Sequence, residues 1–176
     1  MKAKYWVLTL TSLGVLILDQ WTKLLVLEKL PLYRRVVVIP GFFNLTHVRN
    51  TGGAFGIFGG EKGGPGSFLF VAISFVAILS IFFFFKRLGN EGRTLRFPLA
   101  LVLGGAVGNL IDRLRLGEVI DFLDFYVSFY HWPAFNVADS AITVGVIAIL
   151  IDGLFIHREQ PAQQSVARSA PTDAGA

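Results

Sequence analysis

Long apolar stretches, separated by short polar segments, dominate this chain. Four of them are long enough to cross a bilayer, over residues 5–27, 67–85, 97–114 and 137–156. A hydrocarbon core about 30 Å thick is crossed by roughly 20 helical residues. The stretch over 67–85 carries no charged residue. The pattern predicts an all-α membrane protein, a four-transmembrane-helix bundle.

Composition supports a membrane protein, because 53% of the residues are apolar and only 16% are charged. The absence of cysteine excludes disulfides, a thiol nucleophile and cysteine metal sites. The net charge of +4 raises the possibility of nucleic-acid binding. The basic residues form no patch and gather at the ends of the apolar stretches, which favours membrane topology and no nucleic-acid partner.

The basic residues also predict the orientation of the chain. One set lies before the first stretch, between the second and third, and after the fourth: Lys2, Lys4, Lys86, Arg87, Arg93, Arg96, Arg158 and Arg168. Basic residues mark the cytoplasmic side, so both termini are expected there. The opposing loop over 28–66 also holds five basic residues, so the bias is incomplete. No small-residue cleavage site follows the first stretch, which is therefore expected to be a retained span.

The loops predict further structure. The 35–46 run alternates β-branched and aromatic residues around Pro40-Gly41, so the 28–66 loop is expected to form a small extracytoplasmic β-platform. The glycine-rich part near 50–60 is expected to be a mobile flap. Residues 1–158 would then form one membrane-embedded domain. The segment over 159–176 is rich in Ala, Pro, Gln and Ser, which predicts a disordered cytoplasmic tail.

Several ionisable residues lie in or beside these spans, where charge is costly and therefore suggests function. Asp19 and Lys23 are one helical turn apart and can pair. Asn109, Asp112 and Arg113 share one helix face, which must point into the bundle. Three glycines just before them in the third span, Gly104, Gly105 and Gly108, indicate close helix packing.

Two further carboxylates flank the last loop of the chain. Asp121 lies just after the third span, and Asp139 lies where the chain re-enters the membrane at the same edge. Taken singly, Asp139 is a first-turn acid beside the N-cap Asn136, and Asp121 and Asp124 are solvated loop acids. Taken together, Asp121 and Asp139 can divide one proton between an acid and a base, as in aspartic proteases. Asp124 is expected to point away from them.

The residues alone leave other functions open. Asp19, Lys23 and Asp139 could form the charged pathway of a small transporter or proton-relay protein, although only Asp152 lies near the cytoplasmic side. A non-enzymatic scaffold locked together by its polar cluster is a further alternative. No metal site is expected, because the three histidines lack the spacing of a metal-binding pair.

Five segments of this sequence resemble the lipoprotein signal peptidase (signal peptidase II) family. They are 18–23 (LDQWTK), 50–56 (NTGGAFG), 104–113 (GGAVGNLIDR), 119–122 (VIDF) and 135–139 (FNVAD). The resemblance runs from about residue 16 to 145, in order along four predicted spans. Gly53 is a mild departure, since alanine is expected there.

The resemblance implies an intramembrane aspartic endopeptidase of the bacterial inner membrane. Such enzymes cleave prolipoproteins before a diacylglyceryl-modified cysteine, need no cofactor and are blocked by globomycin-like cyclic peptides. A monomer embedded in membrane lipid, with its active site on the extracytoplasmic side, is expected. The implied roles are catalytic for Asp121 and Asp139, substrate-binding for Asn50, Asn109 and Arg113, and supporting for Asp19, Lys23, Asp112 and Asn136.

Overall fold

The computed structural model describes residues 2–52, 65–89 and 92–169. It contains four long helices, α1 (Lys2–Lys29), α2 (Pro65–Arg87), α3 (Arg96–Leu116) and α4 (Val137–Ser169), with a short 3₁₀ turn, η2 (Arg93–Leu95), before α3. Each of the four is long and apolar enough to cross a membrane. The four predicted helices are therefore present.

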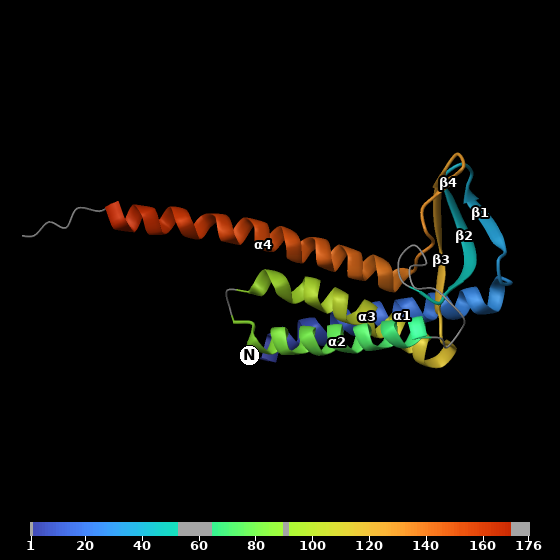
Figure 1. Ribbon diagram of the computed structural model, residues 1–176, viewed down its shortest axis with the longest axis horizontal. Helices are drawn as coiled ribbons and strands as arrows, with labels where there is room; N and C mark the ends of the chain where they lie inside the picture. Colours follow the sequence, from blue (N-terminus) through green and yellow to red (C-terminus); the bar gives the residue numbers. More distant parts are fainter. Residues whose placement is uncertain (1, 53–64, 90–91, 170–176) are drawn as a thin grey trace, which may run out of the picture.

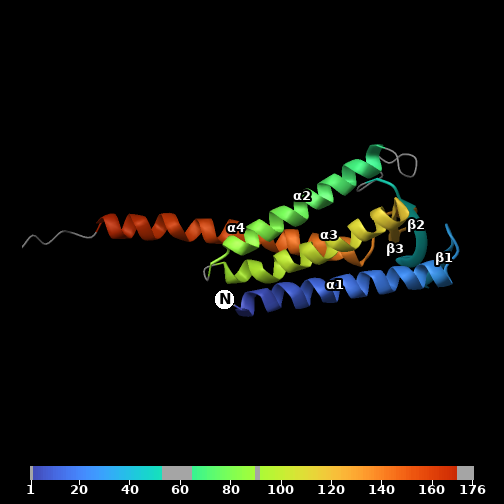
Figure 2. The same cartoon turned by 90° about the horizontal axis from the view of Figure 1, so that it is seen from below.

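Helix α3 lies at the centre of the bundle and contacts the other three helices (Figure 2). Its glycines make this possible, because a Cβ added to Gly104 would lie 2.8 Å from the backbone oxygen of Ser12 in α1. A Cβ on Gly105 would collide with the backbone of Ala138 in α4. The close packing predicted for these small residues is confirmed.

A four-stranded antiparallel sheet lies at one end of the bundle (Figure 1). Its order is β1 (Arg35–Ile39), β2 (Phe43–Asn50), β3 (Val119–Val127) and β4 (Tyr130–His131). The β1–β2 hairpin turns at Gly41, whose φ of 77° suits glycine. The small β-platform expected from residues 28–66 is thus present as β1 and β2, and two further strands, β3 and β4, extend it.

Strands β3 and β4 come from the segment after α3, which was expected to be a loop. The β3 sequence VIDFLDFYV is rich in β-branched and aromatic residues, and it pairs with β2 along most of its length. Strand β2 would otherwise leave an edge of unpaired backbone groups beside the bundle. The sheet therefore joins two segments that are far apart in the sequence.

The fourth helix is longer than its predicted span over 137–156. Helix α4 continues to Ser169. The segment over 159–176, expected to be a disordered tail, is therefore helical up to Ser169. Alanine, glutamine and arginine in this segment are good helix formers and can extend a helix that has already begun. Most of the flap expected near 50–60 lies outside the described residues.

Candidate functional site

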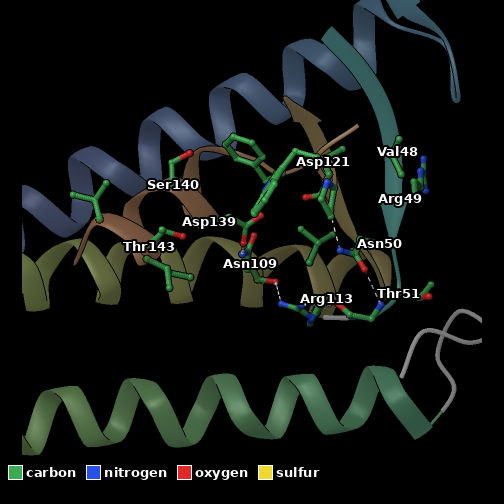
Figure 3. A pocket seen from close by; sticks show the side chains of 18 residues that line it. Val48, Arg49, Asn50, Thr51, Asn109, Arg113, Asp121, Asp139, Ser140 and Thr143 are labelled. Carbon is green, nitrogen blue, oxygen red and sulfur yellow. Dashed lines mark hydrogen bonds between the residues drawn. The ribbon is translucent and has the colours of Figure 1, made fainter. Parts of the chain in front are cut away.

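A pocket of 720 Å³ lies where the sheet meets α3 and α4 (Figure 3). Five residues predicted to carry function line it: Asn50, Asn109, Arg113, Asp121 and Asp139. They come from β2, α3, β3 and α4, so the sheet and two helices build one site. The convergence expected from the sequence is observed.

Asp121 lies on β3 and is 2% exposed. Its Oδ1 accepts a hydrogen bond of 2.7 Å from Asn136 Nδ2, and its Oδ2 accepts one of 3.0 Å from Asn50 Nδ2. Burial raises the pKa of Asp121 to about 7, the neighbouring Asp139 adds to the rise, and the two amide bonds oppose it. The alternative of a solvated loop acid is therefore wrong for Asp121.

Asp139 lies in the first turn of α4, three residues after Asn136. The backbone N–H of Asp139 donates to Asn136 Oδ1 at 2.9 Å, and the backbone N–H of Asn136 donates to Asp139 Oδ2 at 3.3 Å. This reciprocal pair is a capping arrangement, so the predicted N-cap is confirmed. The other oxygen, Oδ1, accepts a bond of 2.7 Å from Asn109 Nδ2.

Arg113 joins α3 to the end of β2. Its Nη2 donates to the backbone oxygen of Gly52 at 3.3 Å, and its Nη1 donates to the backbone oxygen of Asn109 at 3.4 Å. The guanidinium carbon lies 5.3 Å from the ring centroid of Phe70 in α2. Arg113 thus places a cation at the pocket wall, beside the two carboxylates.

Three charged residues form a buried cluster beneath the pocket. Lys23 Nζ lies 2.9 Å from Asp19 Oδ2 and 2.8 Å from Asp112 Oδ2. All three residues are 2% exposed or less. The Asp19–Lys23 pair expected from the one-turn spacing is confirmed, and Asp112 completes it. The cluster joins α1 to α3 and contacts Asn109, which lines the pocket.

Some residues near the site were given no role from the sequence. Gln20 donates to Asp19 Oδ2 at 3.2 Å and to Asp112 Oδ1 at 3.0 Å, and its place between Asp19 and Lys23 was a usable signal. Others line the pocket: Thr51, Trp132, Ser140 and Thr143. Thr143 could have been found from its one-turn spacing to Asp139. Trp132 could not, because its segment was expected to be a loop.

Asp124 is the clearest correction among the polar residues. It is 4% exposed rather than solvated, although it does not line the pocket, as expected. It accepts hydrogen bonds from His131 Nδ1 at 2.7 Å and Asn44 Nδ2 at 2.9 Å, and Arg35 Nε lies 3.4 Å away. Burial acts to raise the pKa of Asp124, but these partners outweigh it and hold the pKa below its usual value.

No group of three or more His, Cys, Asp or Glu residues that could hold a metal ion occurs in the described part of the chain. The pocket is lined by two carboxylates (Asp121 and Asp139), two asparagines (Asn50 and Asn109) and two arginines (Arg49 and Arg113). Two carboxylates beside one another can exchange protons with water and with a leaving group. Such an arrangement suits hydrolysis.

Comparisons with known proteins show the family of this chain. The family model described as signal peptidase (SPase) II matches residues 11–155. The lipoprotein signal peptidase of Desulforapulum autotrophicum is 50% identical over 148 residues, covering 84% of this chain and 91% of that protein. That of Geobacter metallireducens is 45% identical over 161 residues, covering 91% and 98%.

Solved structures show the same fold. A bacterial membrane enzyme solved by the in meso method at 2.3 Å resolution has a TM-score of 0.76 and 35% identity, covering 84% of this chain and 87% of that one. A second, at 1.9 Å resolution, has a TM-score of 0.73 and 32% identity, covering 84% and 92%. The chain therefore belongs to the signal peptidase II family.

Proposed function

We propose that this membrane protease removes signal peptides from bacterial prolipoproteins by aspartic catalysis, with Asp121 and Asp139 as its catalytic pair. The observation that carries the proposal is that both carboxylates line one pocket and are held there by asparagines. Asn136 contacts both of them, because its Nδ2 donates to Asp121 Oδ1 and its backbone N–H donates to Asp139 Oδ2. Two such groups at one site favour a single shared proton.

The environment of each carboxylate suggests its role. The raised pKa of Asp121, about 7, favours this residue as the holder of the proton. Asp139 then acts as the base, taking a proton from water as the water oxygen attacks the scissile carbonyl carbon. Asp121 gives its proton to the amide nitrogen as the carbon–nitrogen bond breaks. The proton taken up by Asp139 balances the proton that Asp121 gives up.

The rest of the pocket supports a lipidated peptide substrate. Its lining along α4 continues past Asp139 through Ile142, Thr143 and Val144, into the membrane-spanning part of the helix. An apolar wall there suits the acyl chains of a diacylglyceryl-modified cysteine, with cleavage just before that residue. Arg113, Asn109 and Asn50 bind the substrate near its polar groups. Globomycin-like cyclic peptides would inhibit by occupying the same pocket.

The proposed location is the bacterial inner membrane, with the site at its extracytoplasmic side and both termini in the cytoplasm. The basic residues at the end of α2, Lys86 and Arg87, lie at the opposite end of the bundle from the sheet (Figure 1). Basic residues favour the cytoplasmic side, which leaves the sheet and pocket outside. The enzyme acts as a monomer in membrane lipid, without a cofactor.

The test uses the purified full chain and a lipidated prolipoprotein precursor. Asp139→Asn should abolish cleavage while the protein stays folded, because the base is lost and the shape is kept. The matched control is Asp152→Asn in the same helix, whose residue does not line the pocket and whose activity should be retained. Full cleavage by Asp139→Asn would overturn the aspartic mechanism.

A further inference from the structure

The two carboxylates of the proposed pair receive N–H donors from three asparagines. Asn50 and Asn136 donate to Asp121, and Asn109 and the backbone of Asn136 donate to Asp139. An asparagine amide has a donor end and an acceptor end of nearly the same shape. If the amide of Asn109 turned over, Asp139 would face an oxygen instead of an N–H. Something must therefore set the orientation of this amide.

Lys23 is placed to set it. An ammonium carries three donors and no acceptor, and Lys23 Nζ has three acceptors around it. Two are the carboxylates of Asp19 and Asp112, and the third is Asn109 Oδ1 at 2.9 Å. Because the ammonium can only donate, the oxygen of the Asn109 amide must face it. The Nδ2 end then points to Asp139 Oδ1, at 2.7 Å.

The carboxylates that flank Lys23 also hold the backbone beside each proposed catalytic residue. Asp19 Oδ1 accepts from the backbone N–H of Ala138, which precedes Asp139, at 2.9 Å. Asp112 Oδ2 accepts from the backbone N–H of Ile120, which precedes Asp121, at 3.3 Å. The cluster therefore holds the backbone beside both proposed catalytic residues without lining the pocket.

We propose that Lys23 is a positioning residue, which acts through the Asn109 amide to present an N–H to Asp139. This inference rests on the proposed catalytic pair. The N–H stabilises the ionised form of Asp139, which is the form that takes a proton from water. Asn136 Nδ2 also donates to Asn109 Oδ1, at 3.2 Å, so the loss of Lys23 removes the shorter of the two bonds, at 2.9 Å, that hold this oxygen. Where the amide then turns over, its oxygen opposes the ionised carboxylate. Lys23 is 1% exposed, so it acts without contact with substrate.

The test must separate this role from simple support of the fold. Lys23→Met alone leaves two buried carboxylates without their cation and is expected to unfold the protein. The variant is therefore the charge-balanced pair Lys23→Met with Asp112→Asn, in which the new amide oxygen can still accept from Ile120. We expect kcat to fall roughly tenfold with little change in KM, as for one lost hydrogen bond at a reacting group. The acid limb of the kcat profile should move to higher pH.

A double-mutant cycle with Asn109→Ala identifies the route of the effect. If Lys23 acts through Asn109, the charge-balanced pair should cause no further shift of the pH profile in the Asn109→Ala background. An unchanged profile in the charge-balanced pair, or a full further shift without Asn109, would overturn the inference. Asp139→Asn provides the separate check, because activity in that variant would overturn the proposed function instead.

Discussion

Asp121 and Asp124 lie three residues apart on β3, and the two are buried to a similar degree, yet their surroundings differ. Residues at an odd separation in a strand point to opposite faces of the sheet. Asp121 faces the pocket, with another carboxylate nearby, and its pKa rises to about 7 through burial and the charge of Asp139. Asp124 faces His131, Asn44 and Arg35, and its pKa is lowered despite burial.

This comparison shows that burial alone does not decide the charge of a carboxylate. Asn44 lies directly opposite Asp124 in the β2–β3 register, while Arg35 and His131 reach it from β1 and β4. One carboxylate thereby contacts side chains from all the other strands and is satisfied as an anion. Asp121 has asparagine donors but a like charge beside it, which favours one retained proton.

The largest expected difference between the two residues is in catalysis. Asp121→Asn should lower kcat about 10²–10⁴-fold, because general acid catalysis is lost. Asp124→Asn, on the opposite face of the same strand, should keep most of the activity. Cleavage of a lipidated precursor by both purified variants measures this difference, with thermal unfolding as the control for folding. Equal losses in the two variants would remove the functional contrast.

The contrast also predicts a pH dependence. The pKa of Asp121 is raised to about 7, so the residue keeps its proton below that pH and loses it above. We expect kcat/KM to fall about tenfold per pH unit above about pH 7, because Asp121 is then ionised and cannot donate a proton. Asp124→Asn should show the same fall of kcat/KM at high pH as the wild type. A wild-type profile flat from pH 6 to 9 would contradict the assigned role of Asp121.

Two arginines, Arg113 near Asp121 and Arg35 near Asp124, extend the comparison to smaller effects. Arg113→Lys should lower kcat/KM roughly tenfold, because an ammonium cannot bridge Gly52 and Asn109 as the planar guanidinium does. Arg35→Lys is the matched control beside Asp124, where the arginine side chain is 52% exposed, and activity should hardly change. Equal activity and substrate affinity in Arg113→Lys would reduce Arg113 to an interfacial anchor.

The smallest expected effect is on stability. Asp124→Asn should lower the free energy of unfolding by about 1–3 kcal/mol, because asparagine offers one acceptor oxygen where Asp124 offers two to Asn44, His131 and Arg35. The lowered pKa of Asp124 means that its contribution is present above the usual value of 3.8 and lost as the pH falls through the lowered pKa. Thermal unfolding at pH 7 and pH 3 measures this. The difference between the wild type and Asp124→Asn should be larger at pH 7 than at pH 3.

Local patterns made much of the architecture predictable. The four spans follow from predominantly apolar runs of sufficient length, whatever the rest of the chain does. The Asp19–Lys23 pair follows from one-turn spacing, and the Asn136–Asp139 cap follows from a separation of three residues. Each of these depends on residues close in the sequence. The hypothesis that Asp121 and Asp139 meet needed only the knowledge that both flank one short loop.

Only the tertiary structure decided the features that join distant segments. Strand β3 forms because β2 offers an edge, and the burial of Asp124 follows from Asn44, 80 residues earlier. The contact of Lys23 with Asn109 likewise needs α1 to pack on α3 through the glycines of α3. Residue spacing determines which side chains share one helix or strand. Which carboxylate meets a cation, and which meets another carboxylate, depends on packing between elements that no local pattern specifies.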